Sequence, residues 1–518
     1  MLTRLFHSTC YGFGTRLGPA ACVLALCGVL WTVDSKQTQL RRFGDDQEYL
    51  TMTTSLARHR SADFRRDDDR QTLSVLPLSW SRSLRRKFDP QPAPVGYYPS
   101  LDGRFYGYHF FTYSLLVTPM RLLLHGRSDE SRAHQYTNLL CFAAALCSLL
   151  WIAPKPRQFW TLLPLVFASP ILWFTRYAAT ETFVYSFCVI ALSAYLSGRM
   201  LLAILFSAIA ATQYQPLVFI PLLMFSSLVH RVWMVRAEYS RGRLVGRLAL
   251  GALCAGLIFV PGAFYLHHFG TPSVIAREGF ARTRFMSLAR FAWMFVDLNG
   301  GMLIYTPGLL LMSIVASAWA IERALRDREL WGIAMLLCAL ATLFASTCQR
   351  NWNQQTFGVS RYVLYSMPAF FLFIGFELAR HRTKARTLGL LAGATLALQL
   401  ASQSYFGFFR YQGGDAAHHS KVARYVLEHW PALYSPPAET FCERTVKSCL
   451  IDLDTAEPMP RFLPAIWRDS HGVAHKILAQ RCDVDRILSA ANWSEQERER
   501  IEAAAAKCRG IGTFYIDL

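Results

Sequence analysis

The sequence predicts an all-α polytopic membrane protein with about eleven transmembrane helices and a small α+β exterior domain at its C-terminus. Of the 518 residues, 53% are hydrophobic and only 17% are charged, whereas a soluble domain carries about 25% charged residues. The mean hydropathy of +0.21 over so long a chain indicates apolar segments that no single soluble core would bury. The aromatic content of 14% excludes intrinsic disorder. Lipid is therefore the expected solvent.

The first apolar segment, residues 17–33, is expected to remain as a signal anchor, because residues 30–33 lack the small side chains of a cleavage site. A polar exterior loop, 34–135, follows it. Ten further segments approach the roughly 20 residues that a bilayer span needs. They are 136–153, 159–174, 181–197, 200–213, 216–230, 247–267, 301–321, 329–347, 361–379 and 387–404. Between 199 and 230, the polar run 213–216 with its proline is expected to break the chain into two short helices.

The loop charges predict the orientation, since cytoplasmic loops are enriched in Lys and Arg. A cytoplasmic N-terminus places on the inner side Lys155, Arg157, Arg231, Arg236, Arg241, Arg243, Arg323, Arg326, Arg328, Arg380, Arg382, Lys384 and Arg386. This bias, together with binding of phosphate or anionic lipid, accounts for the net charge of +19. Nucleic-acid binding is the alternative, but no zinc-finger, RNP or basic-helix pattern supports it, and no nucleic-acid partner is expected.

These assignments give two domains, a transmembrane domain 1–404 and an exterior domain 405–518. The latter holds four cysteines, Cys442, Cys449, Cys482 and Cys508, which suit two disulfides in an oxidising compartment, with three connectivities allowed. A four-cysteine zinc site is the alternative, although the spacings lack a C-x₂-C knuckle. The tail is expected to include a helix over 494–507 and a strand over 512–516.

Three acids stand together just after the first span: Asp45, Asp46 and Glu48. Carboxylates so placed suit proton abstraction from a hydroxyl or the binding of a divalent cation. The alternative is structural, with Asp45 or Asp46 capping a helix that begins there. The run 67–69 of three aspartates is interpreted as a charged surface.

Later in the same loop, Asp102 and Gly103 mark a tight turn. The aromatic run that follows, which contains His109, is predicted to be a helix at the membrane interface. His109 is a candidate for orienting a substrate, with an ordinary interfacial histidine as the alternative.

This order of motifs resembles the GT-C superfamily of membrane glycosyltransferases, above all the bacterial relatives of protein O-mannosyltransferases and the lipid A aminoarabinose transferases. Three later segments are similar to the same group: 175–181, which ends in Glu181, then 299–307, and 351–362, which ends in Arg361 and Tyr362. The resemblance covers about residues 17–404. Asn353 and Gln354 stand where relatives often have glycines, and the tail matches no part of the pattern.

The resemblance implies a polyprenyl-phosphate-linked sugar donor, a glycan, lipid or protein acceptor, and inverting transfer on the exterior side of a bacterial inner membrane. It makes Asp45 the base, with Asp46 or Glu48 positioning the acceptor or a divalent cation. Substrate-binding candidates are Asp102, His109, Glu181, Arg350 and Arg361, with Arg277, Arg282 and Arg284 as further cations for phosphate. Arg361 has snorkelling to the interface as its alternative, and Glu181 has pairing with Arg176.

Two other classes of protein fit part of the pattern. A multi-span transporter or lipid flippase would also show broken helices, but the two halves of the chain show no internal repeat. A non-catalytic envelope assembly protein would tolerate substitution of Asp45 and Asp46.

Overall fold

The computed structural model describes residues 13–35, 45–76, 96–234, 236–237, 240–353, 359–381, 385–405, 418–446, 449, 458–480, 484–506 and 513–518. The chain divides into two compact units. The first comprises Met1–Glu278, Gly308–Ala345 and Leu364–Leu400, and the second comprises Gly279–Pro307, Ser346–Val363 and Ala401–Leu518. Two segments that the sequence analysis assigned to the transmembrane domain, 279–307 and 346–363, are thus grouped with the tail. The domain boundary at 404 stays a prediction.

Long apolar helices dominate the first unit, as predicted. They are α2 (Phe13–Ser35), α7 (Ala133–Ser148), α8 (Pro156–Phe167), α9 (Glu181–Leu196), α10 (Met200–Gln213), α11 (Phe219–Met234), α12 (Arg241–Gly256), α13 (Val260–Phe269), α17 (Pro307–Asp327), α18 (Trp331–Ser346), α19 (Arg361–Arg380) and α20 (Ala385–Tyr405). Helix α9 packs against α7 and α10. In the apolar stretch of α19, 94% of the residues are buried, against 17% in that of α2. Helix α19 is therefore a core helix, whereas most of α2 is not covered by the rest of the chain.

Among the described residues, six helical segments are long and apolar enough to cross a membrane. A seventh arises when α8 and the 3₁₀ helix η3 (Pro170–Arg176), which meet at a bend of 51°, are taken as one span. Shorter apolar helices are α9, α10 and α18. The predicted break after α10 is confirmed, since η4 (Gln215–Val218) separates α10 from α11. A helix covers each of the eleven predicted segments, but the number of spans stays a prediction.

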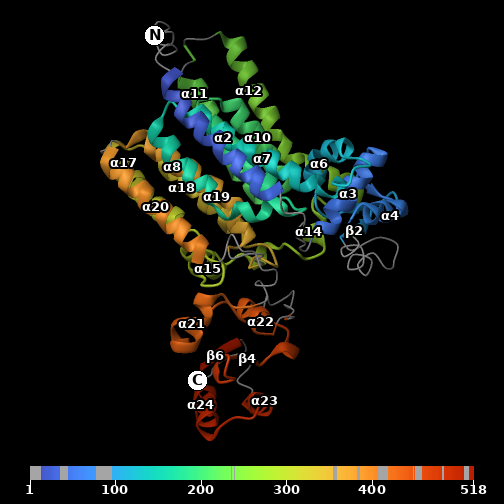
Figure 1. Ribbon diagram of the computed structural model, residues 1–518, viewed down its shortest axis with the longest axis vertical. Coiled ribbons are helices and arrows are strands. Elements are labelled where there is room, and N and C mark those ends of the chain that lie inside the picture. The colour runs from blue at the N-terminus through green and yellow to red at the C-terminus, as the bar shows by residue number, and fades with distance from the viewer. Residues whose placement is uncertain are drawn as a thin grey trace. The chain divides into compact units, whose positions relative to one another are not determined.

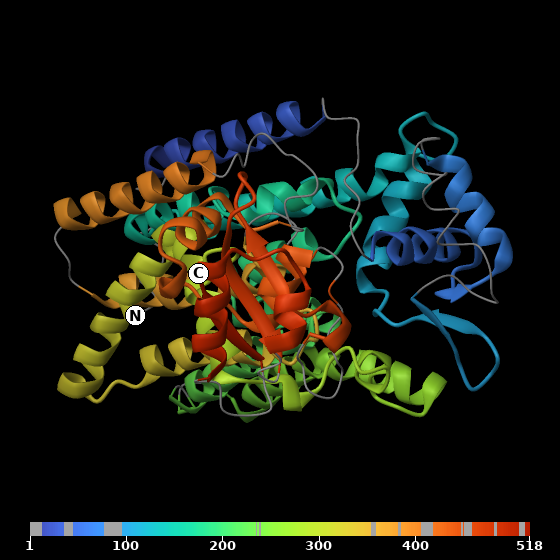
Figure 2. The same ribbon diagram turned by 90° about the horizontal axis from the view of Figure 1, so that it is seen from below.

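The segment between α2 and α7, which the sequence predicts to be an exterior loop, is itself folded. It contains α3 (Asp46–His59), β1 (Asp63–Phe64), α4 (Arg66–Val75), β2 (Tyr97–Pro99), β3 (Phe105–Gly107) and α6 (Thr112–Leu123), and its three strands form an antiparallel sheet in the order β1-β3-β2. Figures 1 and 2 show these elements gathered at one end of the long helices of the first unit.

Two expectations for this loop are wrong. The aromatic run after Gly103 forms strand β3, and the helix begins only at Thr112, because Tyr98 and Tyr106 face each other across the β2–β3 ladder. The run 67–69 is not simply a charged surface. Asp68 is fully buried. Its carboxylate accepts hydrogen bonds from Ser55 Oγ in α3 (2.9 Å) and from the backbone N–H of Arg65, the N-cap residue of α4 (2.9 Å), so it ties α3 to α4.

The second unit contains α15 (Leu288–Val296), α16 (Met302–Tyr305), α21 (Lys421–His429), α22 (Ala438–Val446), α23 (Val484–Ser489) and α24 (Glu495–Ala506). Its antiparallel sheet has the order β4-β5-β6, formed by Ala465–Arg468, Ala474–Gln480 and Thr513–Asp517. Buried hydrogen bonds join the segment 279–307 to the tail: Asn299 Nδ2 donates to Tyr434 Oη (2.7 Å), and Arg290 pairs with Glu439 (2.8 Å). The predicted terminal helix and strand are confirmed within the described residues.

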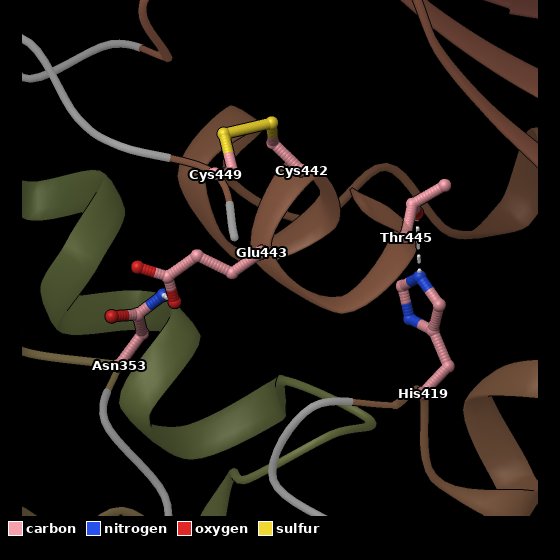
Figure 3. The surroundings of a disulfide bond; sticks show 6 residues. All are labelled: Asn353, His419, Cys442, Glu443, Thr445 and Cys449. Atoms are coloured by element: carbon pink, nitrogen blue, oxygen red, sulfur yellow. Dashed lines mark hydrogen bonds between the residues drawn. A yellow bond between two sulfur atoms is a disulfide. The ribbon is translucent and has the colours of Figure 1, made fainter. Parts of the chain in front are cut away.

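A disulfide joins Cys442, within α22, to Cys449, which follows that helix (Figure 3). This pairing confirms the disulfide interpretation for these two cysteines and removes them as zinc ligands. Cys482 and Cys508 lie outside the described residues. Close to the disulfide, Asn353 Nδ2 donates a hydrogen bond of 2.9 Å to Glu443, whose pKa rises to about 7 because the side chain is buried and lies near Glu439.

Candidate functional site

The acids that follow the first span meet the β2–β3 hairpin in the first unit. Asp45 lies immediately before α3, and Glu48 lies in the first turn of that helix. After β3, the chain returns to this turn with Tyr108 and His109, and the backbone N–H of Tyr108 donates to Gly96 O (2.9 Å). The hairpin therefore brings Tyr108 and His109, about sixty positions along the chain, onto the start of α3.

His109 lies between the two carboxylates. Its Nδ1 is 2.7 Å from Glu48 Oε2, and its backbone N–H donates to Glu48 Oε1 over 2.9 Å. Its Nε2 is 3.9 Å from Asp45 Oδ2, close enough for electrostatic attraction. Tyr108 Oη donates to Asp45 Oδ1 over 3.0 Å. Glu48 thus fixes the imidazole ring, and Tyr108 fixes the carboxylate of Asp45.

Two glycines make room for Glu48. A Cβ atom at Gly107 would lie 2.3 Å from Glu48 Oε1 and 2.6 Å from Met52 Cε. Gly96 has φ +96°, and a Cβ there would lie 3.3 Å from Glu48 Oε2. The carboxylate therefore sits directly against hairpin backbone, where only glycine leaves enough space.

Burial sets the electrostatics of Glu48. The Glu48 side chain is 2% exposed, and its burial raises the pKa of its carboxyl group. The nearby charge of Asp45 raises this pKa further, whereas His109 partly offsets both effects. The protonated form of Glu48 is therefore more favourable here than it is for an exposed glutamate.

Asp45 and Asp46 occupy different surroundings. The Asp45 side chain is 19% exposed, whereas Asp46 is 1% exposed and accepts the backbone N–H of Gln47 over 2.8 Å. The capping alternative holds for position only: Asp45 is the residue before the helix, but its side chain makes no capping hydrogen bond. Of the three acids, Asp45 is the one that solvent or a substrate can reach.

Tyr49 connects this cluster to Glu181. Burial raises the pKa of Tyr49 well above its usual value, and the neighbouring charges of Glu48, Asp45 and Glu181 raise it further. Gln213 Nε2 donates to Tyr49 Oη over 3.4 Å. Glu181 is 3% exposed at the first position of α9. The structure thus places Glu181 within electrostatic range of the same tyrosine as the acids of the first loop.

Arg176, which the sequence suggests as an ion-pair partner for Glu181, pairs with Asp34. Asp34 is the buried penultimate residue of α2. Gln135 Nε2 also donates to Asp34 Oδ2, over 3.1 Å. These contacts anchor the C-terminal end of α2 to α7 and η3, and they set the starting point of the first loop.

Asp102 lies at the tip of the β2–β3 hairpin. It accepts a hydrogen bond from Ser100 Oγ, which lowers its pKa, and it pairs with Arg104 (3.5 Å). Gly103 beside it has φ +77°. These contacts match the tight turn that the sequence predicts, and they give Asp102 a role in shaping the hairpin that carries His109.

The candidate phosphate-binding arginines are divided between the units. Arg277 belongs to the first unit and pairs with Glu278 (2.9 Å). Arg282, Arg284, Arg350 and Arg361 belong to the second unit. The Arg350 backbone N–H donates to Phe280 O (2.7 Å), and Arg361 Nη2 donates to Tyr362 Oη (3.2 Å) at the start of α19.

Within the described parts of the chain, no group of three or more His, Cys, Asp or Glu side chains is placed to hold a metal ion. Glu48 directs both of its oxygens to His109, and Asp46 is buried. Among the described residues, Asp45, Asp46 and Glu48 are therefore not arranged as a shared divalent-cation site.

Tyr49 and Tyr108 are the site residues that the sequence analysis missed. Both flank predicted residues, Glu48 and His109, but tyrosines are common near a membrane interface. The segment that forms β3 was predicted to be helical, and only its pairing with β2 brings Tyr108 to Asp45.

No protein-family model matches the chain, and no curated protein matches it. Two solved structures are similar. ArnT from Cupriavidus metallidurans bound to undecaprenyl phosphate aligns over 72% of this chain and 62% of its own, with 14% identity and a TM-score of 0.37. The apo state of the same protein aligns over the same shares, with 14% identity and a TM-score of 0.35. The chain therefore matches less than two thirds of the length of these neighbours.

Proposed function

We propose that this chain is a membrane glycosyltransferase that moves a sugar from a polyprenyl-phosphate-linked donor to an acceptor hydroxyl on the exterior side of a bacterial inner membrane. The acceptor class is a glycan, a lipid or a protein. The observation that carries the proposal is the cluster at the start of α3, where a reachable Asp45 carboxylate lies beside a histidine fixed by a buried glutamate. The order of motifs along the chain also supports it.

In this proposal Asp45 is the general base. As the acceptor oxygen attacks the anomeric carbon, its proton passes to an Asp45 oxygen, and the bond between the anomeric carbon and the lipid phosphate breaks with inversion. Tyr108 holds one oxygen of Asp45 by its hydrogen bond, which orients the carboxylate. A positioned base of this kind contributes about 10²–10⁴-fold to the rate.

His109 and Glu48 act as positioning residues for that base. The His109 ring stabilises the Asp45 carboxylate before proton transfer, and Glu48 holds the ring through two contacts to the same residue. Glu181, which shares the neighbourhood of Tyr49, is assigned to the hydroxyls of the sugar or the acceptor. Asp46, being buried, supports the helix start.

The leaving group is a lipid phosphate, and its developing charge needs cations. We assign this role to Arg361 and Arg350, because a guanidinium group offers phosphate a two-pronged hydrogen-bond donor. Arg361 is the first residue of the apolar helix α19, and the loop charges predict that this end of the helix is exterior. Replacement of either arginine should reduce affinity for the lipid donor more than it reduces the affinity for the acceptor.

The test measures undecaprenyl phosphate release in membranes that contain the full-length protein. The donors are a panel of undecaprenyl-phosphate-linked sugars, and cell-envelope extract supplies the acceptors. Asp45→Asn should lower the release rate about 10²–10⁴-fold. The matched control is Asp67→Asn, an acid in the same loop whose side chain is 73% exposed, and it should retain the wild-type rate.

Two outcomes would favour the alternatives. A transporter or lipid flippase would move labelled donor across the membrane of sealed vesicles without releasing undecaprenyl phosphate. An assembly protein would support neither process, and its Asp45→Asn variant would behave as the wild type in cells.

A further inference from the structure

A hollow lies at the opposite ends of the long helices from the acids of the first loop, within the first unit. It has a volume of about 630 Å³, within the range of about 300–1,000 Å³ typical of small-molecule sites. The ends of α9, α10, α11, α12, α18 and α19 line it. The loop charges predict that these helix ends face the cytoplasm.

The hollow is basic. Its lining includes Arg199, Arg231, Arg247 and Arg380, and no Asp or Glu is among the described residues that line it. Arg380 pairs with Glu329 (2.7 Å) just beyond the hollow, which leaves a net positive lining. An anion is the ligand that such a lining complements.

Aromatic rings hold the guanidinium groups in place. The Cζ atom of Arg199 lies 4.4 Å from the centroid of the Trp151 ring, and that of Arg231 lies 5.6 Å from the Tyr195 ring. Cation–π contacts of this kind restrict long side chains without neutralising their charge. The arginines are therefore ordered in advance, which reduces the entropy lost when an anion binds.

The remaining walls are apolar. Leu201, Leu202, Leu228, Val232 and Phe376 line the hollow together with Trp331. A smaller hollow of about 310 Å³ adjoins it, shares Leu201 and Arg247 with it, and adds Arg243 and Leu250. A soluble anion would use only the arginines. A molecule with a phosphate at one end and hydrocarbon at the other would use both parts of the lining.

We propose that this hollow binds an anionic phospholipid of the cytoplasmic leaflet. The phosphodiester would contact Arg199, Arg231 and Arg247, and the first part of an acyl chain would pack against Leu201, Leu202 and Leu228. Basic pockets between transmembrane helices on the cytoplasmic side are suited to such headgroups. The proposed lipid site is separate from the residues assigned to sugar transfer and does not depend on that assignment.

The test is native mass spectrometry of the delipidated full-length protein, titrated with dioleoylphosphatidylglycerol, dioleoylphosphatidylcholine or inorganic phosphate. Phosphatidylglycerol should bind at least about tenfold more tightly than phosphatidylcholine. The combined variant Arg199→Gln, Arg231→Gln, Arg247→Gln should lose about a hundredfold in affinity for phosphatidylglycerol, at about fivefold for each arginine, and should keep its weak affinity for phosphatidylcholine.

The control variant removes the same charge from the same predicted side: Arg157→Gln, Arg236→Gln, Arg241→Gln. None of these three residues lines either hollow, so the affinity for phosphatidylglycerol should stay within about threefold of the wild-type value. A further variant, Leu202→Trp, fills the hollow without changing charge, since Leu202 is 39% exposed and lines it. It should weaken phosphatidylglycerol binding about tenfold or more.

Four results would overturn the proposal. Equal binding of the two lipids would show an apolar groove alone. Equal loss in the control variant would show a general effect of surface charge. Unchanged phosphatidylglycerol binding in the combined variant Arg199→Gln, Arg231→Gln, Arg247→Gln would place the lipid elsewhere. Displacement of phosphatidylglycerol by inorganic phosphate at a similar concentration would identify a site for free phosphate. Size-exclusion profiles and Tm values of the variants check that each remains folded.

Discussion

Replacing Glu48 by Gln should slow sugar transfer by altering the histidine beside Asp45. Gln keeps the size of the side chain, and its oxygen can still accept the backbone N–H of His109. It loses the charge that faces His109 Nδ1 at 2.7 Å. A hydrogen bond to a charged group contributes about 1.5–3 kcal/mol. If that contribution is realised in the transition state, the rate falls about 10- to 150-fold, because about 1.36 kcal/mol corresponds to tenfold.

Initial rates of undecaprenyl phosphate release at varied donor concentration would measure this change. A positioning role predicts that kcat falls while KM changes by less than about threefold. It also predicts a change in the pH profile. Because the pKa of Glu48 is raised by burial, the wild-type rate should fall as the pH drops through that raised value, and the variant should lose this part of the acid limb.

An unchanged kcat and pH profile in the folded Glu48→Gln variant would refute the role of the Glu48–His109 pair. A fall in rate accompanied by an equal loss in the Asp67→Asn control would assign the effect to the charge of the loop. The Tm of each variant separates both results from misfolding.

Three further changes have expected outcomes. Gly107→Ala should destabilise the protein by about 1–3 kcal/mol and reduce the transfer rate, because its Cβ would meet Glu48 Oε1 at 2.3 Å. In contrast, Gly246→Ala, within α12 and with nothing within 4 Å of its Cβ, should keep the wild-type rate and should not lower Tm, and thermal unfolding with rate assays compares the two. Asp69→Asn should raise Tm at pH 8 and leave it unchanged at pH 3, because burial and Asp68 raise the pKa of Asp69 to about 7, so the native state binds the proton more tightly and loses stability as the pH rises from about 4 to 7; a Tm difference that grows toward low pH would contradict this sign. Cys442→Ser with Cys449→Ser should lower the unfolding free energy by about 2–3 kcal/mol, measured without reductant, and dithiothreitol should lower the wild-type value by more than it lowers that of the variant.

The helices were predictable because each apolar segment is a local property of the chain. The break at Gln213–Pro216 followed from a proline and polar groups inside an apolar run. The closeness of Asp45 and Glu48 also followed from the sequence, since both lie within one helical turn. The pairing of Cys442 with Cys449, seven positions apart, was one of the pairings that the sequence allowed.

Contacts between distant residues were beyond the sequence patterns. The antiparallel register that sets Tyr98 opposite Tyr106 is not coded by any local period, and the aromatic run after Gly103 carries an apolar pattern that suits a helix as well as a strand. The approach of His109 to Glu48 depends on this register. The burial of Asp68 likewise depends on partners in α3, whereas its neighbours in sequence are all charged.

The most direct measurement is a cryo-electron microscopy structure of the full-length Asp45→Asn variant in lipid nanodiscs with an undecaprenyl-phosphate-linked sugar. The anomeric carbon should lie within about 7 Å of the side chain at position 45, which leaves room for one acceptor oxygen between them. The lipid phosphate should lie beside Arg361 or Arg350. A donor bound far from the first turn of α3, with its phosphate against other residues, would contradict the proposed site.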